Sequence, residues 1–213
     1  MKKQIAILGS TGSIGKNTFD ILLKDKESFE IFLLTSNGNI NEMIKQTKKF
    51  KVKNIIISNK QKYYYLKKKL VNKKINIYNN LESINKIFTK KIDYCMCAIS
   101  GLEGLKSTLD MIKFSKTIAV ANKESLICGW NLIYKELKKN KTKFIPVDSE
   151  HFSIWTLLKG SKLSNVEKII ITASGGPFLN TPIKKFNNIT PKTAMKHPNW
   201  KMGNKISIDS ATL

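Results

Sequence analysis

Short apolar runs alternate with segments of helical spacing along the first 120 or so residues. The runs that predict strands are 4–8, 30–35, 54–58, 75–78, 93–99, a segment ending near residue 120, and 144–147. The segments that predict helices are 16–23, 40–50, 63–70, 81–88 and 101–114. This alternation is typical of an α/β fold, in which a Rossmann-like, doubly wound parallel sheet is covered by helices on both faces. The regular alternation ends near residue 147, and a helix over 151–158 and a strand over 166–173 are expected beyond it.

The formal net charge of +23 raises the question of a nucleic acid or an anionic membrane surface. All 38 basic residues are Lys, however, and Arg is the preferred reader of bases and phosphates. A protein rich in Lys, Ile and Asn is also what an AT-rich genome encodes. We therefore expect no nucleic-acid partner.

The three cysteines, Cys95, Cys97 and Cys128, show neither a metal-ligand nor a disulfide spacing. No apolar run is long enough to span a bilayer, and the first strand begins too early to leave room for a signal peptide. We expect a cytoplasmic protein with no membrane partner.

The first predicted strand runs directly into GSTGSIG and then into a helix. This order is the phosphate-binding opening of a dinucleotide-binding domain. Gly9, Gly12 and Gly15 form GxxGxxG and not the stricter GxGxxG, so a glycine-rich turn without a ligand is the alternative.

The second predicted strand ends in SNGN, with no Asp or Glu for the ribose hydroxyls of NAD. Ser36, Asn37 and Asn39 could donate hydrogen bonds to a 2′-phosphate, which favours NADP. An ordinary Asn-Gly turn is the equally weighted alternative.

Two further motifs follow predicted strands and so belong to the same edge of the sheet. Lys123, between Asn122 and Glu124, could contact a substrate phosphate or carbonyl, or could simply begin a helix. Asp148 and Glu150, two residues apart after a buried strand, could bind one hard cation, with the Ser149 hydroxyl free to meet a substrate. A helix N-cap is the competing interpretation of Asp148.

Two loops near the C-terminus also carry candidate chemistry. The backbone amides of SGGPF, 174–178, could cradle an anion, although a plain turn before a proline explains the same letters. His197 and Trp200 lie in a polar loop, where a tryptophan could belong to a flap that closes over a ligand.

Together, LGSTGSIG, ANKES, PVDSEH, SGGPF, HPNW and KISIDSAT, in this order, resemble the 1-deoxy-D-xylulose 5-phosphate reductoisomerase family. The resemblance implies an NADPH-dependent enzyme that needs Mg²⁺ or Mn²⁺ and is usually a homodimer. Such an enzyme rearranges the carbon skeleton of its phosphorylated sugar substrate and then reduces the resulting aldehyde to 2-C-methyl-D-erythritol 4-phosphate.

The resemblance also implies roles for individual residues. Those implied for NADPH are Thr11, Gly12, Ser13, Ile14, Asn37, Gly38, Asn39, Asn122, Glu124 and Gly203. Asp148 and Glu150 would bind the metal and, with Lys123 and His197, form the catalytic group. Substrate contacts would come from Lys123, Ser149, Glu150, Ser174, His197, Trp200 and Ser210, of which Ser174 and Ser210 would meet the phosphate. Trp200 and Met202 would belong to the closing flap.

The chain departs from the family pattern at two places. The family commonly has a glycine and then a basic residue after the second strand, where this chain has Asn37 and Gly38. The chain also ends at Leu213, before the third metal-binding Glu, an Asn, a Lys and a C-terminal helical domain would follow. We therefore expect an NADPH-binding domain over 1–147 and the first part of an α+β catalytic domain over 148–213, with the helical domain absent.

Two other functions are compatible with parts of the sequence. Another NADP-linked oxidoreductase could share the glycine motif, although it would not explain VDSEH, SGGPF and HPNW together. A non-catalytic protein that binds NADPH or an anionic partner is the second alternative.

Overall fold

The computed structural model describes residues 1–71, 74–173, 175–200 and 203–212. They form two compact units, Met1–Gly160 and Ser161–Leu213. Each unit is described by itself below.

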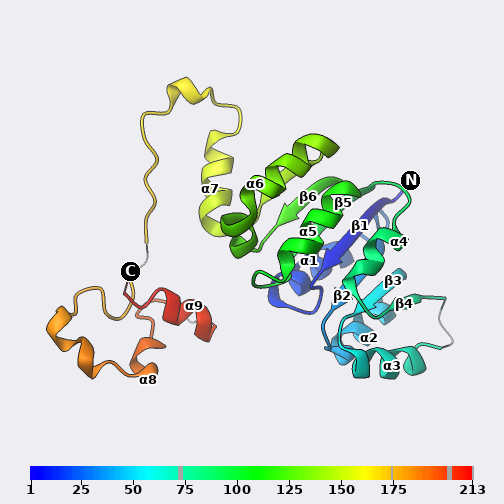
Figure 1. Cartoon of the computed structure of the whole chain (residues 1–213), viewed down its shortest axis with the longest axis horizontal. Coiled ribbons are helices and arrows are strands. Elements are labelled where there is room, and N and C mark those ends of the chain that lie inside the picture. The colour runs from blue at the N-terminus through cyan, green and yellow to red at the C-terminus, as the bar shows by residue number, and fades with distance from the viewer. Residues whose placement is uncertain (72–73, 174, 201–202, 213) are drawn as a thin grey trace. The chain divides into compact units, whose positions relative to one another are not determined.

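The first unit contains one parallel sheet of seven strands in the order β4-β3-β2-β1-β5-β6-β7 (Figure 1). The strands are β1 (Lys3–Leu8), β2 (Phe29–Ser36), β3 (Val52–Ile57), β4 (Asn76–Tyr78), β5 (Ile92–Cys97), β6 (Ser115–Val120) and β7 (Lys143–Pro146). The helices are α1 (Ser13–Leu23), α2 (Ile40–Lys49), α3 (Lys60–Lys69), α4 (Ile84–Ile87), α5 (Gly104–Lys113), α6 (Lys123–Asn140) and α7 (Ser149–Leu158). The α/β prediction is confirmed.

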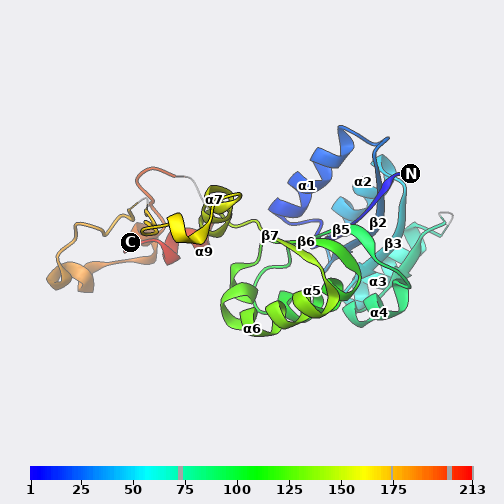
Figure 2. The same ribbon diagram turned by 90° about the horizontal axis from the view of Figure 1, so that it is seen from above.

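Helices cover the sheet on two faces, with α1 and α2 on one side and α5 and α6 on the other (Figure 2). Strand β1 shows why the strands read as continuous apolar runs. Ile5 and Ile7 pack into the core beneath α1 and α2, whereas Ala6 and Leu8 pack into the core beneath α5 and α6. Because both faces are buried, both sets of alternate residues must be apolar.

The order of the strands reverses between β1 and β5, which both lie in the middle of the sheet. In open parallel sheets, ligands bind outside the carboxyl ends of the strands at such a switch point. The last residues of neighbouring strands pair directly, Leu8 with Cys97 and Cys97 with Val120. The loops that carry the predicted motifs of this unit therefore start from one edge.

The second unit consists of short helical segments joined by irregular chain. They are the 3₁₀ turns Leu163–Asn165 and Ile183–Asn188, and the helices α8 (Pro191–Ala194) and α9 (Asn204–Asp209). The strand predicted over 166–173 is wrong, because this segment has no regular structure and exposes Ile169, Ile170 and Ile171. A strand needs a hydrogen-bonded neighbour, and the described part of this unit provides none.

The unit division after Gly160 groups α7 with the sheet. The boundary at residue 147 and the assignment of 148–213 to a catalytic domain stay predictions. Among the described helices, none is long and apolar enough to cross a membrane.

We expect Gly9→Ala to cost about 3 kcal/mol of unfolding free energy, since it combines a left-handed backbone with a clash. Gly9 has φ +76°, and a Cβ there would lie 2.6 Å from the carbonyl oxygen of Ala98. Gly101 is the matched control, because its φ is +73° and a Cβ there would meet no atom within 4 Å. Gly101→Ala should cost only about 1 kcal/mol. Equal losses for the two variants in urea unfolding would show that the contact with Ala98 has no energetic weight.

Candidate functional site

The loop between β1 and α1 lies close against the end of β5. Besides the contact at Gly9, a Cβ on Gly15 would overlap the carbonyl oxygen of Gly9 and the backbone of Ser10. The two glycines therefore let the loop pack between the end of β5 and the first turn of α1. This is the close packing of strand, turn and helix that a dinucleotide-binding opening requires.

The N-terminus of α1 is open to a ligand. Gly12 is its N-cap, with no side-chain hydrogen bond to the helix, and Gly12, Ser13 and Ile14 are exposed. Backbone N–H groups at the start of a helix attract anions, through hydrogen bonding and through the helix dipole. The residues expected to bind the cofactor pyrophosphate thus lie where a phosphate can be held.

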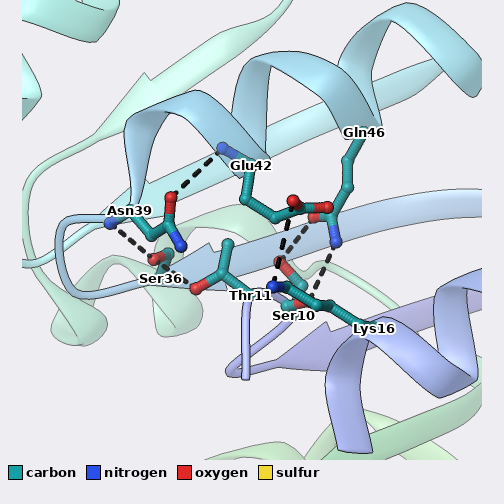
Figure 3. Close-up of polar contacts among 7 residues, drawn as sticks. All are labelled: Ser10, Thr11, Lys16, Ser36, Asn39, Glu42 and Gln46. Atoms are coloured by element: carbon teal, nitrogen blue, oxygen red, sulfur yellow. Dashed lines mark hydrogen bonds and ion pairs between the residues drawn. The ribbon is translucent and has the colours of Figure 1, made fainter. Parts of the chain in front are cut away.

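Two buried side chains that the sequence reasoning missed fix this loop. Gln46 accepts a hydrogen bond from the Ser10 hydroxyl at 2.9 Å and donates one to the Ser10 carbonyl at 2.8 Å (Figure 3). The Thr35 hydroxyl accepts a hydrogen bond from the backbone N–H of Gly9 at 2.9 Å. The available signal was the position of Gln46, three residues after Met43 on the buried face of α2.

The loop after β2 lies beside the glycine loop. The hydroxyls of Thr11 and Ser36 are 2.8 Å apart, and Ser36 also accepts a hydrogen bond from the N–H of Asn39 at 3.3 Å. Asn39 is the N-cap of α2, and its side chain accepts from the N–H of Glu42 at 3.2 Å (Figure 3). Asn37 and Asn39 remain exposed, so the turn interpretation and a role in binding are compatible.

Asn122 has a structural role at the start of α6. Its Nδ2 donates to the carbonyls of Ile99 at 2.6 Å and Gly101 at 2.5 Å, and its Oδ1 accepts from the N–H of Ser125 at 3.0 Å. The side chain is buried and ties the loop after β5 to the first turn of α6. Lys123, the first residue of that helix, is exposed at this edge, followed by Glu124.

Asp148 is the N-cap of α7, as the alternative interpretation of the sequence held. Its Oδ1 accepts from the backbone N–H of His151 at 3.0 Å and lies 2.7 Å from the Nδ1 of that ring. The carboxylate is only 6% exposed, yet its Oδ2 is buried with no hydrogen-bond partner among the described residues. Because a buried carboxylate oxygen needs a partner, Oδ2 fits a cation and the cap does not exclude metal binding.

The charge of Asp148 also suits a cation. Burial raises the pKa of its carboxyl group, but the hydrogen bonds from His151 outweigh burial and leave the pKa below the ordinary 3.8. A lowered pKa means that this carboxylate stabilises the fold at neutral pH, and that the stabilisation is lost as the pH falls through the folded-state value.

Glu150 is the second predicted metal ligand, and its Oε2 accepts from the Ser149 hydroxyl at 2.9 Å. The described residues hold no cluster of three His, Cys, Asp or Glu side chains that could bind a metal. Asp148 and Glu150 are thus a partial ligand set.

In the second unit, Gly176 and Phe178 of the SGGPF motif pack against the end of α9. A Cβ on Gly176 would overlap the backbone of Ser210 and Ala211, and the N–H of Phe178 donates to the carbonyl of Ala211 at 3.0 Å. Two of the predicted substrate motifs are therefore neighbours. The hydroxyl of Ser210 donates to the carbonyl of Ile206 at 2.8 Å. Ser174 and Met202 lie outside the described residues.

His197 is held by its own loop. Its Nδ1 accepts from the backbone N–H groups of Asn199 at 3.1 Å and Trp200 at 3.0 Å. An accepting Nδ1 places the proton of the neutral ring on Nε2, which can then donate to a ligand. Trp200 is 61% exposed, and Gly203 is the N-cap of α9.

The structure thus brings the predicted residues together in two groups. The loops from 9 to 15, 36 to 39, 122 to 124 and 148 to 150 share one edge in the first unit, and the SGGPF loop meets Ser210 in the second.

Two family models match this chain, one over each of two segments. The family model described as 1-deoxy-D-xylulose 5-phosphate reductoisomerase matches residues 5–129, and the model of the C-terminal domain of the same enzyme matches residues 144–213. This chain belongs to the 1-deoxy-D-xylulose 5-phosphate reductoisomerase family. The family resemblance inferred from the six motifs is confirmed.

Individual reductoisomerases are similar along the whole chain. The enzyme of Pelagibacter ubique is 61% identical over 99% of this chain, and that of Caldanaerobacter subterraneus is 42% identical over 99%. The chain spans about 55% of the length of these two relatives. The solved reductoisomerase of Zymomonas mobilis in complex with NADPH is 34% identical with a TM-score of 0.89, over 99% of this chain and 54% of that one. A solved reductoisomerase in complex with NADPH, fosmidomycin and magnesium is 34% identical with a TM-score of 0.83, over 98% and 54%.

We expect Asn122→Ala to lower the free energy of unfolding by about 2 to 3 kcal/mol, because it removes a helix cap and leaves two carbonyls without their donor. Asn39→Ala is the matched control, since Asn39 also caps a helix but its side chain makes, among the described residues, only the cap bond to the N–H of Glu42. That variant should lose about 1 kcal/mol. Urea unfolding of both variants measures the difference, and a loss at Asn122 no larger than at Asn39 would rule out the bridge between the loops.

Proposed function

We propose that this chain carries the NADPH-binding region and part of the catalytic region of an enzyme that converts 1-deoxy-D-xylulose 5-phosphate to 2-C-methyl-D-erythritol 4-phosphate. The observation that supports it most is the N-terminus of α1, which no side chain caps. It lies at the switch point of the sheet, beside the loop 36–39, which contains no carboxylate. Both belong to a chain that the reductoisomerase models match in two segments, 5–129 and 144–213. This would place the protein in isoprenoid precursor biosynthesis.

NADPH would lie along the carboxyl edge of the sheet. Backbone N–H groups of residues 11–14 would hold the pyrophosphate, and the loop 37–39 would meet the ribose phosphate. Asn122 would act mainly by positioning its neighbours, because its side-chain amide is already used within the protein. Glu124 and Gly203 complete the proposed cofactor contacts.

A Mg²⁺ or Mn²⁺ ion would be held by Asp148 and Glu150, and it would supply the Lewis acid that an α-hydroxy ketone needs. Asp148 would offer its unpartnered Oδ2 while Oδ1 stays on His151. Two carboxylates leave room for further ligands around a hard cation, which usually takes six or more oxygens.

The remaining predicted residues would bind the phosphorylated sugar. Lys123 and the Nε2–H of His197 are donors for its oxygens, Ser149 adds a hydroxyl, and Trp200 would cover the ligand. Ser174 and Ser210 would meet the phosphate.

We further propose a homodimer in the cytoplasm with no nucleic-acid or membrane partner. The three free thiols support a reducing compartment.

Isothermal titration of the 213-residue chain with NADPH and with NADH tests this function, followed by NADPH consumption on addition of 1-deoxy-D-xylulose 5-phosphate and Mn²⁺. We expect NADPH to bind more tightly than NADH. Equal affinities would refute the cofactor assignment. Affinity that falls steeply with salt for any polyanion would instead indicate a basic interaction protein.

We expect Asp148→Asn to weaken Mn²⁺ binding by about tenfold or more, since one anionic ligand becomes neutral. The fold should be kept, because Asn caps a helix as well as Asp does. Asp20→Asn, an exposed acid on α1, controls for the loss of one negative charge. Electron paramagnetic resonance of free Mn²⁺ measures both, and an unchanged affinity for Asp148→Asn would remove this residue from the metal site.

A further inference from the structure

The loops that follow β2 and β3 run side by side at the carboxyl edge. The N–H of Ser58 donates to the carbonyl of Ser36 at 3.1 Å, and the N–H of Asn59 donates to the carbonyl of Asn37 at 2.9 Å. The start of α3 is therefore fixed against the loop that follows β2. Residues on the first turn of α3 can reach what this loop binds.

The stem of Lys62 lies over Gly38. A Cβ on Gly38 would be 3.4 Å from the Cγ of Lys62 and 3.6 Å from the Cβ of Asn59. The backbone of Lys62 is held as well, because its N–H donates to the Oδ1 of Asn59, the N-cap of α3, at 3.0 Å. Gly38 has no side chain, and an added Cβ would already be in van der Waals contact with the lysine stem, so the stem of Lys62 lies close over the backbone of this loop.

The charges around this loop leave Lys62 available for an anion. Lys62 is exposed, and no carboxylate among the described residues lies within ion-pair distance of it. Glu42, an acid in the first turn of α2, lies 4.0 Å from Lys16 instead. An anion at the end of β2 would meet the hydroxyl of Ser36, the amides of Asn37 and Asn39, and this ammonium group.

We propose that Lys62 determines the preference for NADPH over NADH by pairing with the 2′-phosphate of the adenosine ribose. In dinucleotide-binding folds this group is met at the end of β2, where a nearby cation accommodates it. Here the cation comes from the next helix, across a glycine. The inference rests on the proposed cofactor.

The test is isothermal titration of the full chain with NADPH and NADH for the unaltered protein, Lys62→Gln, Lys62→Arg and Lys68→Gln. Lys68 is an exposed lysine six residues further along α3, about 9 Å along the helix axis. It changes the net charge of the same helix equally, and so controls for the general attraction of a basic protein for an anionic nucleotide.

We expect Lys62→Gln to weaken NADPH binding about tenfold, the value of one charge-assisted contact at an exposed position, and to leave NADH binding unchanged. Lys62→Arg should keep the preference, and Lys68→Gln should change neither affinity more than about twofold. Equal effects of the two glutamine variants would overturn the proposal, because the charge would then act only through the general field.

The outcomes separate this inference from the proposed function. If the unaltered chain prefers NADPH and Lys62→Gln keeps that preference, the assignment of Lys62 alone is wrong. If the unaltered chain binds neither nucleotide, or binds both equally, the proposed cofactor fails and this inference fails with it.

Discussion

The contact between the backbone of Gly9 and the carbonyl of Ala98 sets the geometry of the first unit. It joins the ends of β1 and β5, the two strands between which the order of the sheet reverses. Neighbouring elements are tied to these two strand ends by side chains, through Thr35 and Gln46 on one side and through Asn122 on the other. A side chain at position 9 would separate the two strand ends. Glycine is therefore required there for space, whatever ligand the edge binds.

Several of the abundant asparagines of this chain cap helices that begin at the carboxyl edge of the sheet. Asn39, Asn59, Asn80 and Asn122 are all N-caps whose side chains accept from the N–H three residues on. A short amide suits this task because it can turn back onto its own helix. A composition rich in Asn therefore lowers the stability of the fold little. Each cap also fixes the residue at which a loop ends and the helix begins.

The sequence predicted the first unit well, because strands buried on both faces and glycines at tight turns leave unambiguous patterns. It could not show that Gln46 and Asn122 act as internal braces, since their partners are backbone carbonyls and hydroxyls distant along the chain. Nor could it decide whether Asp148 is a cap or a ligand. The structure shows that Oδ1 caps the helix while Oδ2 is buried with no hydrogen-bond partner among the described residues, so the cap does not exclude the proposed role as a ligand. The strand predicted over 166–173 is wrong because apolar β-branched residues indicate only that a segment suits a sheet. A strand also needs a partner strand for its backbone hydrogen bonds, and the described residues provide none for this segment.

The exposed isoleucines 169–171 have a consequence for how molecules of this chain behave toward one another. An exposed apolar segment that pairs with no strand among the described residues can be a template on which a strand from another molecule adds. The net charge of +23 opposes such encounters by mutual repulsion. Added salt screens that repulsion and leaves the apolar attraction intact. We therefore expect the colloidal stability of the chain to fall as the ionic strength rises.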